Sequence, residues 1–232
     1  MANSNMLTLG SDLDTMVSGG VEAIHIDIMD GHYVPNLCFP VSVVKNIKQA
    51  HPGLVVDGHL MVDEVEPYIA RLADAGCDAV SFPVDSTRFA RRAISSIQAS
   101  GMRAGVAINP SQPIGLLEPI LGLADYVVLM TVEPGFAGQT FLPGSLARLE
   151  ELVALRAKLG SAALIEIDGG VTYEGAEACA RLGAEIFVTG IYTVYDPALG
   201  LKKGVQQFDA RMEKAGFPTS SSELDRLRRI AR

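Results

Sequence analysis

The chain has 232 residues, 48% of them hydrophobic, and a formal net charge of −8. A chain of this length and hydrophobic content can bury a large core, which excludes an intrinsically disordered protein. The negative charge argues against a nonspecific nucleic-acid binder, because such proteins need a basic surface. An anionic substrate would have to be bound by helix N-termini and loop amides.

The cysteines and the apolar runs exclude further classes of protein. Cys38, Cys77 and Cys179 are far apart and show no CxxC spacing, which predicts reduced thiols rather than disulfides or a cysteine zinc site. No apolar run approaches about 18 residues, so no membrane-spanning helix is expected. The first residues lack the charged leader and apolar core of a signal peptide. We therefore expect a cytoplasmic protein with no membrane partner.

Short apolar runs alternate with amphipathic segments along the chain. Residues 2–19 have helical spacing and end at a pair of glycines. Strands are then predicted at about 22–28, 54–60, 78–82, 103–108, 125–130, 163–168 and 185–189. Helices are predicted between them, at 41–50, 65–75, 86–100, 113–121, 144–159 and 173–182.

The tail, about 198–232, is predicted to be a C-terminal helical extension. It should contain a helix that ends near Gly216, a serine-rich loop and a basic helix from Glu223. We expect the first helix to close the fold. The rest should be exposed to solvent or contact another subunit, and we assign it no chemistry.

Strands that alternate with helices predict parallel βα units in a single α/β domain over 1–232. Two architectures fit, a (β/α)8 TIM barrel and an open doubly wound sheet. The barrel is favoured because polar groups follow several strands instead of meeting at one crevice; they are Asp27, Asp30, His59, Thr131, Asp168 and Gly190. Seven strands are counted from residue 22, so the first strand of the barrel is expected to be missing and to precede residue 2.

Two kinds of side chain alternate along the strand predicted at 22–28. His25, Asp27 and Met29 point to one face, and three isoleucines point to the other. An imidazole and a carboxylate on one face can bind a metal ion or act as acid and base beside it. For this pair alone, a buried His–Asp hydrogen bond without chemistry explains the pattern equally well.

Two further strands carry comparable groups. His59 and Met61 alternate in the same way, although a lone histidine is more commonly a hydrogen-bonded core residue. Asp168 ends a strand, and the glycines after it allow the backbone to approach a ligand closely. Asp168 could equally cap the following helix.

These groups would together form a mixed nitrogen and oxygen metal site. Two histidines and two aspartates suit zinc, iron(II), manganese or cobalt and do not select strongly among them. Two carboxylates beside one metal also suit a two-base proton transfer at a carbon next to a carbonyl. One carboxylate would remove a proton from one face, and the other would return a proton to the opposite face.

Two loops are candidates for binding phosphate. A glycine-rich loop with Gly135 and Gly138 follows the strand at 125–130, but such loops are common and the signal alone is weak. Thr189 and Gly190 end the last strand. Phosphate sites after the seventh and eighth strands recur in barrels of this kind.

Four motifs in this order, HIDIMDGHYVPN, DGHLMV, MTVEPGFAGQTF and IEIDGGV, resemble those of the ribulose-phosphate 3-epimerase family. The similarity runs from about residue 3 to 197, which is most of the chain. It implies a metal-dependent isomerase of the pentose phosphate pathway that forms a homo-oligomer. The implied reaction is epimerisation at the third carbon of a ketose phosphate through an enediolate, with D-ribulose 5-phosphate and D-xylulose 5-phosphate as the first choice.

The resemblance also implies roles for individual residues. One divalent metal would be held by His25, Asp27, His59 and Asp168, with Asp27 and Asp168 as the paired catalytic groups. The expected substrate-binding residues are His25, His59, Met29, Met61, Met130, Gly135, Phe136, Ala137, Gly138, Gly169, Gly170, Gly190 and Ile191. His32, Pro35 and Asn36 match a loop that is structural or forms a lid.

Several positions depart from the family pattern. Family members begin with a strand of the type Pro-Ser-Ile-Leu, whose serine contacts substrate, and this sequence does not contain it. Ala137 replaces a glycine, as in allulose-6-phosphate epimerases, and Ile191 replaces a serine. The segment Ser81-Phe82-Pro83-Val84-Asp85 replaces a strand end that contains histidine. Three alternatives stay open: a D-allulose 6-phosphate 3-epimerase-type paralogue, a truncated non-catalytic homologue, and a longer protein with an upstream start.

Overall fold

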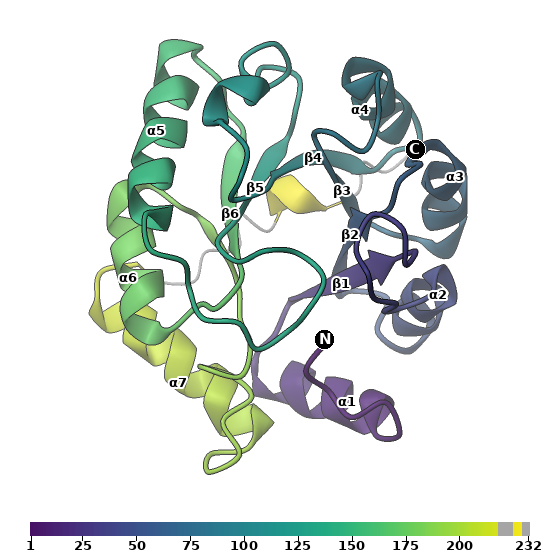
Figure 1. Ribbon diagram of the computed structural model, residues 1–232. Helices are drawn as coiled ribbons and strands as arrows, with labels where there is room; N and C mark the ends of the chain where they lie inside the picture. Colours follow the sequence, from purple (N-terminus) through teal and green to yellow (C-terminus); the bar gives the residue numbers. More distant parts are fainter. Residues whose placement is uncertain (218–224, 229–232) are drawn as a thin grey trace.

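The computed structural model describes residues 1–217 and 225–228. Within these residues, seven strands form one parallel sheet whose spatial order is the order of the chain. They are β1 Ala23–Met29, β2 Val55–Met61, β3 Ala79–Pro83, β4 Arg103–Ile108, β5 Tyr126–Met130, β6 Leu164–Asp168 and β7 Ile186–Val188. Figure 1 shows the sheet curled into a nearly closed barrel with the helices outside it. The predicted TIM barrel is confirmed, because a doubly wound sheet reverses its strand order at a switch point.

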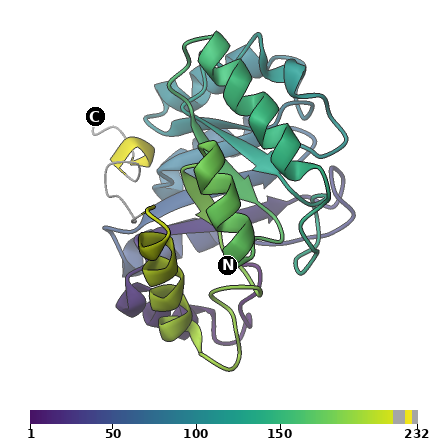
Figure 2. The same cartoon turned by 90° about the vertical axis from the view of Figure 1, so that its left-hand side faces the viewer.

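Helices follow the strands around the outside of the barrel. They are α1 Leu9–Gly19, α2 Val41–Ala50, α3 Glu66–Ala75, α4 Ala90–Ala99, α5 Ser145–Lys158, α6 Tyr173–Leu182 and α7 Leu201–Lys214. Figure 2 shows α5, α6 and α7 along one flank. In the described part of the chain, no helix has the length and apolar character needed to cross a bilayer.

Two predicted helices differ from the structure. The helix predicted at 113–121 is wrong, because only a short 3₁₀ helix forms, at Ile114–Leu117. Gly115 disfavours an α-helix there, and Pro119 has no N–H to continue one. The helix predicted from residue 2 begins only at Leu9, after a turn closed by a hydrogen bond from the Thr8 N–H to the Asn5 carbonyl (2.9 Å).

The alternation predicted for the first strand is present in β1. Its three isoleucines are buried in the layer between the sheet and the helices. His25, Asp27 and Met29 are less buried and point into the barrel, where Asp27 and Met29 line a cavity. The period of two along the strand therefore separates the structural core from the polar interior.

The barrel is open between β1 and β7. Within the described residues no backbone ladder joins these two strands, which confirms that the barrel lacks one strand. A cavity of about 460 Å³ lies along the gap, lined by Ala23 of β1, Ile186 of β7 and Phe208 of α7 among others. Near the site the gap is covered by residues 1–4, where the Met1 nitrogen donates to the carbonyl of His25 (3.3 Å).

The tail is only partly as predicted. The expected closing helix is α7, which packs beside α1. The serine-rich loop and most of the predicted basic helix lie outside the described residues. Residues 225–227 form one helical turn, and Leu227 is 2% exposed, packed among residues that begin strands, such as Val55 and Leu164. The expectation that this part is solvated or contacts another subunit is wrong for Leu227, because its apolar side chain fills the end of the barrel at which the strands begin.

Tyr126 fills the middle of the barrel interior. Its ring is fully buried, and a β-carbon added at Gly105 on the neighbouring strand would lie 2.6 Å from the ring atom Cε1. No real side chain tolerates that distance, so the absence of a side chain at Gly105 makes room for the ring.

Gly105→Ala should lower the free energy of unfolding by about 1–3 kcal/mol, because the added methyl group overpacks the interior. Urea unfolding monitored by circular dichroism measures the change. Gly122→Ala is the control, since a β-carbon there meets nothing within 4 Å. A stability equal to that of the wild type would show that the interior is looser than the packing indicates.

Candidate active site

Three strands bring four predicted side chains together. His25 and Asp27 project from β1, His59 from β2, and Asp168 from the end of β6. Asp27 and His59 are direct partners in the ladder between β1 and β2. One nitrogen or oxygen atom from each of the four side chains lies within 4.8 Å of the others. The predicted set therefore converges on one point.

The spacing of these atoms leaves room for an ion between them. His25 Nε2 is 3.6 Å from Asp27 Oδ1 and 3.7 Å from Asp168 Oδ2, while His59 Nδ1 is 3.5 Å from Asp168 Oδ2. Both nitrogens are buried without a hydrogen-bond partner. The ligand atoms of a tetrahedral ion with bonds of about 2.05 Å lie roughly 3.3 Å apart. Hence the donor set and its spacing fit a divalent metal.

The alternatives for His59 and Asp168 do not describe the structure. A hydrogen-bonded core histidine would have both ring nitrogens satisfied, whereas Nδ1 of His59 is not. The N-cap of α6 is Thr172, whose hydroxyl accepts the N–H of Gly175, so Asp168 does not cap that helix.

Burial and charge shift the pKa values of this cluster. Burial lowers the pKa of His25, but the neighbouring carboxylates of Asp27, Asp57 and Glu166 outweigh it and raise that pKa well above its usual value. Burial raises the pKa of Asp27, but His25 and His59 outweigh burial and lower it below its usual range. Asp27 is thereby kept ionised at neutral pH.

A second group lies beneath the first and was not predicted as part of the site. Asp57, Tyr126 and Glu166 are buried in the interior, and His25 belongs to both groups. Burial, with the charge of Asp57 added, raises the pKa of Glu166 to about 7. The alternation of side chains along a strand could have predicted Asp57 and Glu166. Asp57 lies two positions before His59, and Glu166 lies two positions before Asp168, so each pair shares a strand face.

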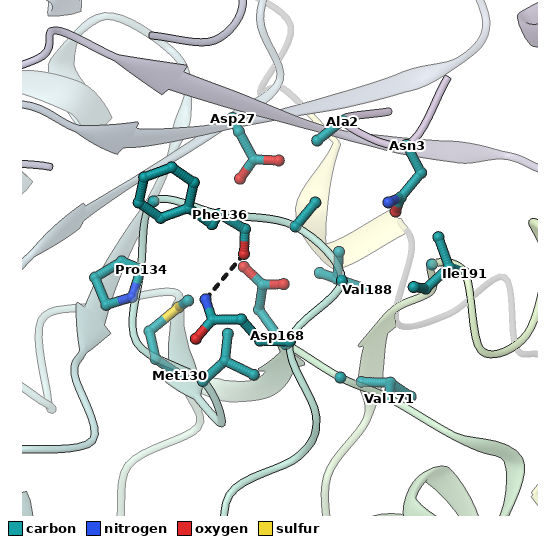
Figure 3. A pocket seen from close by; sticks show the side chains of 18 of the residues that line it. Ala2, Asn3, Asp27, Met130, Pro134, Phe136, Asp168, Val171, Val188 and Ile191 are labelled. Carbon is teal, nitrogen blue, oxygen red and sulfur yellow. Dashed lines mark hydrogen bonds between the residues drawn. The ribbon is translucent and has the colours of Figure 1, made fainter. Parts of the chain in front are cut away.

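A small cavity opens above the four converging side chains. It has a volume of about 100 Å³, and Figure 3 shows Asp27 and Asp168 pointing into it. His25 and His59 lie below its lining. All other predicted substrate-binding residues line it: Met29, Met61, Met130, Gly135, Phe136, Ala137, Gly138, Gly169, Gly170, Gly190 and Ile191. Among the described residues of the lining there is no Lys or Arg, so an anion would meet backbone N–H groups there.

Loops from different strands meet over the cavity. The Asn36 amide donates to the carbonyl of Gly135 (2.7 Å), which joins the loop after β1 to the glycine-rich loop after β5. Gly169 has φ of 113°, and an added β-carbon would overlap Val132. Only glycine fits there, because the chain after Asp168 passes close to the neighbouring loop.

The comparisons with known proteins identify the family of this chain. The model of the "Ribulose-phosphate 3 epimerase family" matches residues 1–194. The chain belongs to this family. It is 35% identical over 182 residues to the ribulose-phosphate 3-epimerase of Aquifex aeolicus, covering 78% of this chain and 82% of that protein. The Bacillus subtilis ribulose-phosphate 3-epimerase is 36% identical over 189 residues, covering 81% and 87%. Members of this epimerase family are isomerases.

Solved structures of low sequence identity share the fold. The 3-hexulose-6-phosphate synthase of Salmonella typhimurium has a TM-score of 0.64 at 19% identity, covering 90% of this chain and 95% of that one. Phosphoribosyl anthranilate isomerase from Thermus thermophilus has the same TM-score at 15% identity, covering 88% and 94%. These likenesses support the barrel fold alone.

Asp30 organises the loop that leaves β1 in this epimerase-family chain. Its carboxylate accepts the backbone N–H groups of His32 (2.8 Å), Tyr33 (2.9 Å) and Asp63 (2.9 Å). Burial opposes ionisation, but these bonds outweigh it and lower the pKa of Asp30. The loop that carries Asn36 is thus tied to the chain after β2.

Asp30→Ala should lower the free energy of unfolding by about 1–3 kcal/mol at neutral pH, because three N–H groups lose a charged acceptor. The folded pKa lies below the unfolded one, so the stabilisation is complete above about pH 4 and is lost as the pH falls through the folded pKa. Urea unfolding near neutral pH and near pH 3 tests this. Asp63→Ala is the control, since Asp63 contributes only its backbone N–H to this carboxylate. A difference from wild type that stays the same at both pH values would contradict the assignment.

Proposed function

We propose that this chain is a metal-dependent epimerase acting at the third carbon of a ketose phosphate. One observation carries the proposal: Asp27 and Asp168 converge with two histidine nitrogens that have no hydrogen-bond partner. This set lies at the bottom of a cavity walled by glycine-rich loops. Membership of the epimerase family supports the same reaction.

A single divalent ion, zinc, iron(II), manganese or cobalt, would be held by Nε2 of His25, Nδ1 of His59, and the carboxylates of Asp27 and Asp168. When bound, it would supply positive charge that stabilises the negative charge developing on the substrate oxygens.

The two carboxylates carry out the proton transfers. Asp27, kept ionised by the two histidines, removes the proton at the third carbon, and Asp168 delivers a proton to the opposite face. In the reverse direction the two residues exchange roles. Met29, Met61 and Met130 form an apolar, adaptable wall around the reacting carbon, which keeps water away and tolerates both epimers.

The loops bind the phosphate group through their backbones. Gly135 to Gly138, Gly169, Gly170 and Gly190 line one end of the cavity, where N–H groups can approach an anion without a cationic side chain. The hydrogen bond from Asn36 to Gly135 holds the loop after β1 against the glycine-rich loop. A homo-oligomer and a cytoplasmic location stay predictions.

D-ribulose 5-phosphate is the proposed substrate, and the names of the relatives support it. Ala137, which replaces a glycine as in allulose-6-phosphate epimerases and lines the cavity, favours one second candidate, D-allulose 6-phosphate. Ile191 also departs from the ribulose-phosphate pattern: it lies 3.5 Å from the position of a β-carbon on Gly138, where a serine hydroxyl would otherwise bond the phosphate. The convergence of the four side chains argues against a non-catalytic homologue.

Asp168→Asn should reduce epimerisation by about 10²–10⁴-fold, because the amide keeps the shape of the side chain but cannot exchange the proton. Xylulose 5-phosphate formation from ribulose 5-phosphate measures the loss, and thermal unfolding shows that the fold is kept. Asp14→Asn, an exposed position on α1, is the matched control. Full activity in a folded Asp168→Asn protein would contradict the mechanism.

The two sugars can be compared directly on one preparation. We expect kcat/KM to be higher for ribulose 5-phosphate than for allulose 6-phosphate, measured with the same metal-loaded protein. The opposite order would identify the six-carbon paralogue. Turnover of neither sugar by a metal-loaded, folded protein would favour the non-catalytic homologue.

A further inference from the structure

The two ring nitrogens of His25 face different groups of carboxylates. Nε2 faces Asp27 and Asp168 at the bottom of the cavity. Nδ1 lies on the other side of the ring, 2.8 Å from Asp57 Oδ2 and 3.0 Å from Glu166 Oε1. A neutral imidazole has one free lone pair and one N–H, so only one of its nitrogens can bind a metal.

The distances distinguish the two sides of the ring. The separation of 2.8 Å between Nδ1 and Asp57 is that of a hydrogen bond, with suitable angles. The separations at Nε2 are too long for hydrogen bonds, and Nε2 has no other partner. When the site holds its metal, His25 would be neutral, with the proton on Nδ1 donated to Asp57 and the lone pair of Nε2 directed at the metal position.

Tyr126 holds Asp57 in the orientation that this bond requires. The other carboxylate oxygen of Asp57 accepts the hydroxyl proton of Tyr126, so both of its oxygens are engaged. Asp57 is 4% exposed, and the ring of Tyr126 is immobilised against Gly105. Neither side chain can rotate without leaving a buried polar group unpaired.

Glu166 also lies close to His25 but does not form a hydrogen bond with it. Its Oε1 atom is 3.0 Å from Nδ1, yet it is buried without a hydrogen-bond partner, so the geometry of the contact is poor. Glu166 thus provides a comparison residue that also carries a carboxyl group beside the same nitrogen.

We propose that Asp57, held by Tyr126, is the positioning residue of the site: it fixes the tautomer and the ring orientation of His25 so that Nε2 can bind the metal. The proposal rests on the proposed function, since it concerns how one ligand of that metal is prepared. Without the acceptor, His25 would rotate or carry its proton on Nε2, and it would cease to be a ligand. Partners of this kind typically change metal affinity by about 10–100-fold.

The test measures Zn²⁺ binding to the chelator-treated, metal-free full chain by calorimetry. Asp57→Ala should weaken binding by about 10–100-fold, and Asp57→Asn, which keeps an acceptor oxygen, should recover part of the loss. Glu166→Gln should weaken binding less than Asp57→Ala does. Added Zn²⁺ should restore turnover of Asp57→Ala with little change in the KM for substrate.

The outcomes separate this proposal from the proposed function. If the wild type binds Zn²⁺ and a folded Asp57→Ala protein binds it equally well, the positioning role is overturned and the metal site stands. If the wild type binds no metal, both are overturned. A measurement on the wild type avoids the question of whether a variant folds. ¹⁵N NMR of the Zn²⁺-loaded protein should show a protonated Nδ1 on His25. An unprotonated Nδ1 would overturn the positioning role of Asp57.

Discussion

His25 stands between two layers of buried carboxylates, and the interior of the barrel depends on how those charges are balanced. Asp27 and Asp168 lie on the cavity side of the ring, and Asp57 and Glu166 lie on the other side. Isolated carboxylates in such a place would be strongly destabilising. The neighbouring carboxylates raise the pKa of His25, and burial beside Asp57 raises the pKa of Glu166 to about 7.

The proposed metal would also neutralise the buried carboxylates that face the cavity, which is a structural role besides its chemical one. The upper group offers two carboxylates and two unpaired nitrogens, which a cation would join. The lower group contains a short hydrogen-bonded chain from Tyr126 through Asp57 to His25. The imidazole of His25 belongs to both groups, so a change in the charge of one group affects the other group through the two ring nitrogens.

The open side of the barrel leaves this arrangement in place. The site stands on β1, β2 and β6, and the ladder between β1 and β2 runs through all seven residues of both strands. The gap between β1 and β7 leaves one edge of β1 without a neighbouring strand among the described residues, yet His25 is oriented by side chains from β2 and β5, across the interior. The wall can therefore be incomplete while the polar interior keeps its geometry.

The sequence by itself determined the βα alternation, the seven strands, and the faces on which His25, Asp27, His59 and Asp168 lie, because periodicity along a strand is a local property. It could not decide whether His59 was a satisfied core residue, or place Asp57 and Tyr126 in the site. Those answers depend on distances between strands far apart in the chain. The helix predicted at 113–121 was wrong because Pro119 interrupts the apolar spacing. The predicted exposure of the tail was wrong for Leu227 alone, because only the curled sheet offers that side chain a buried place. Tertiary structure alone decided which polar groups meet, because hydrogen bonds and ion pairs form between neighbours in space.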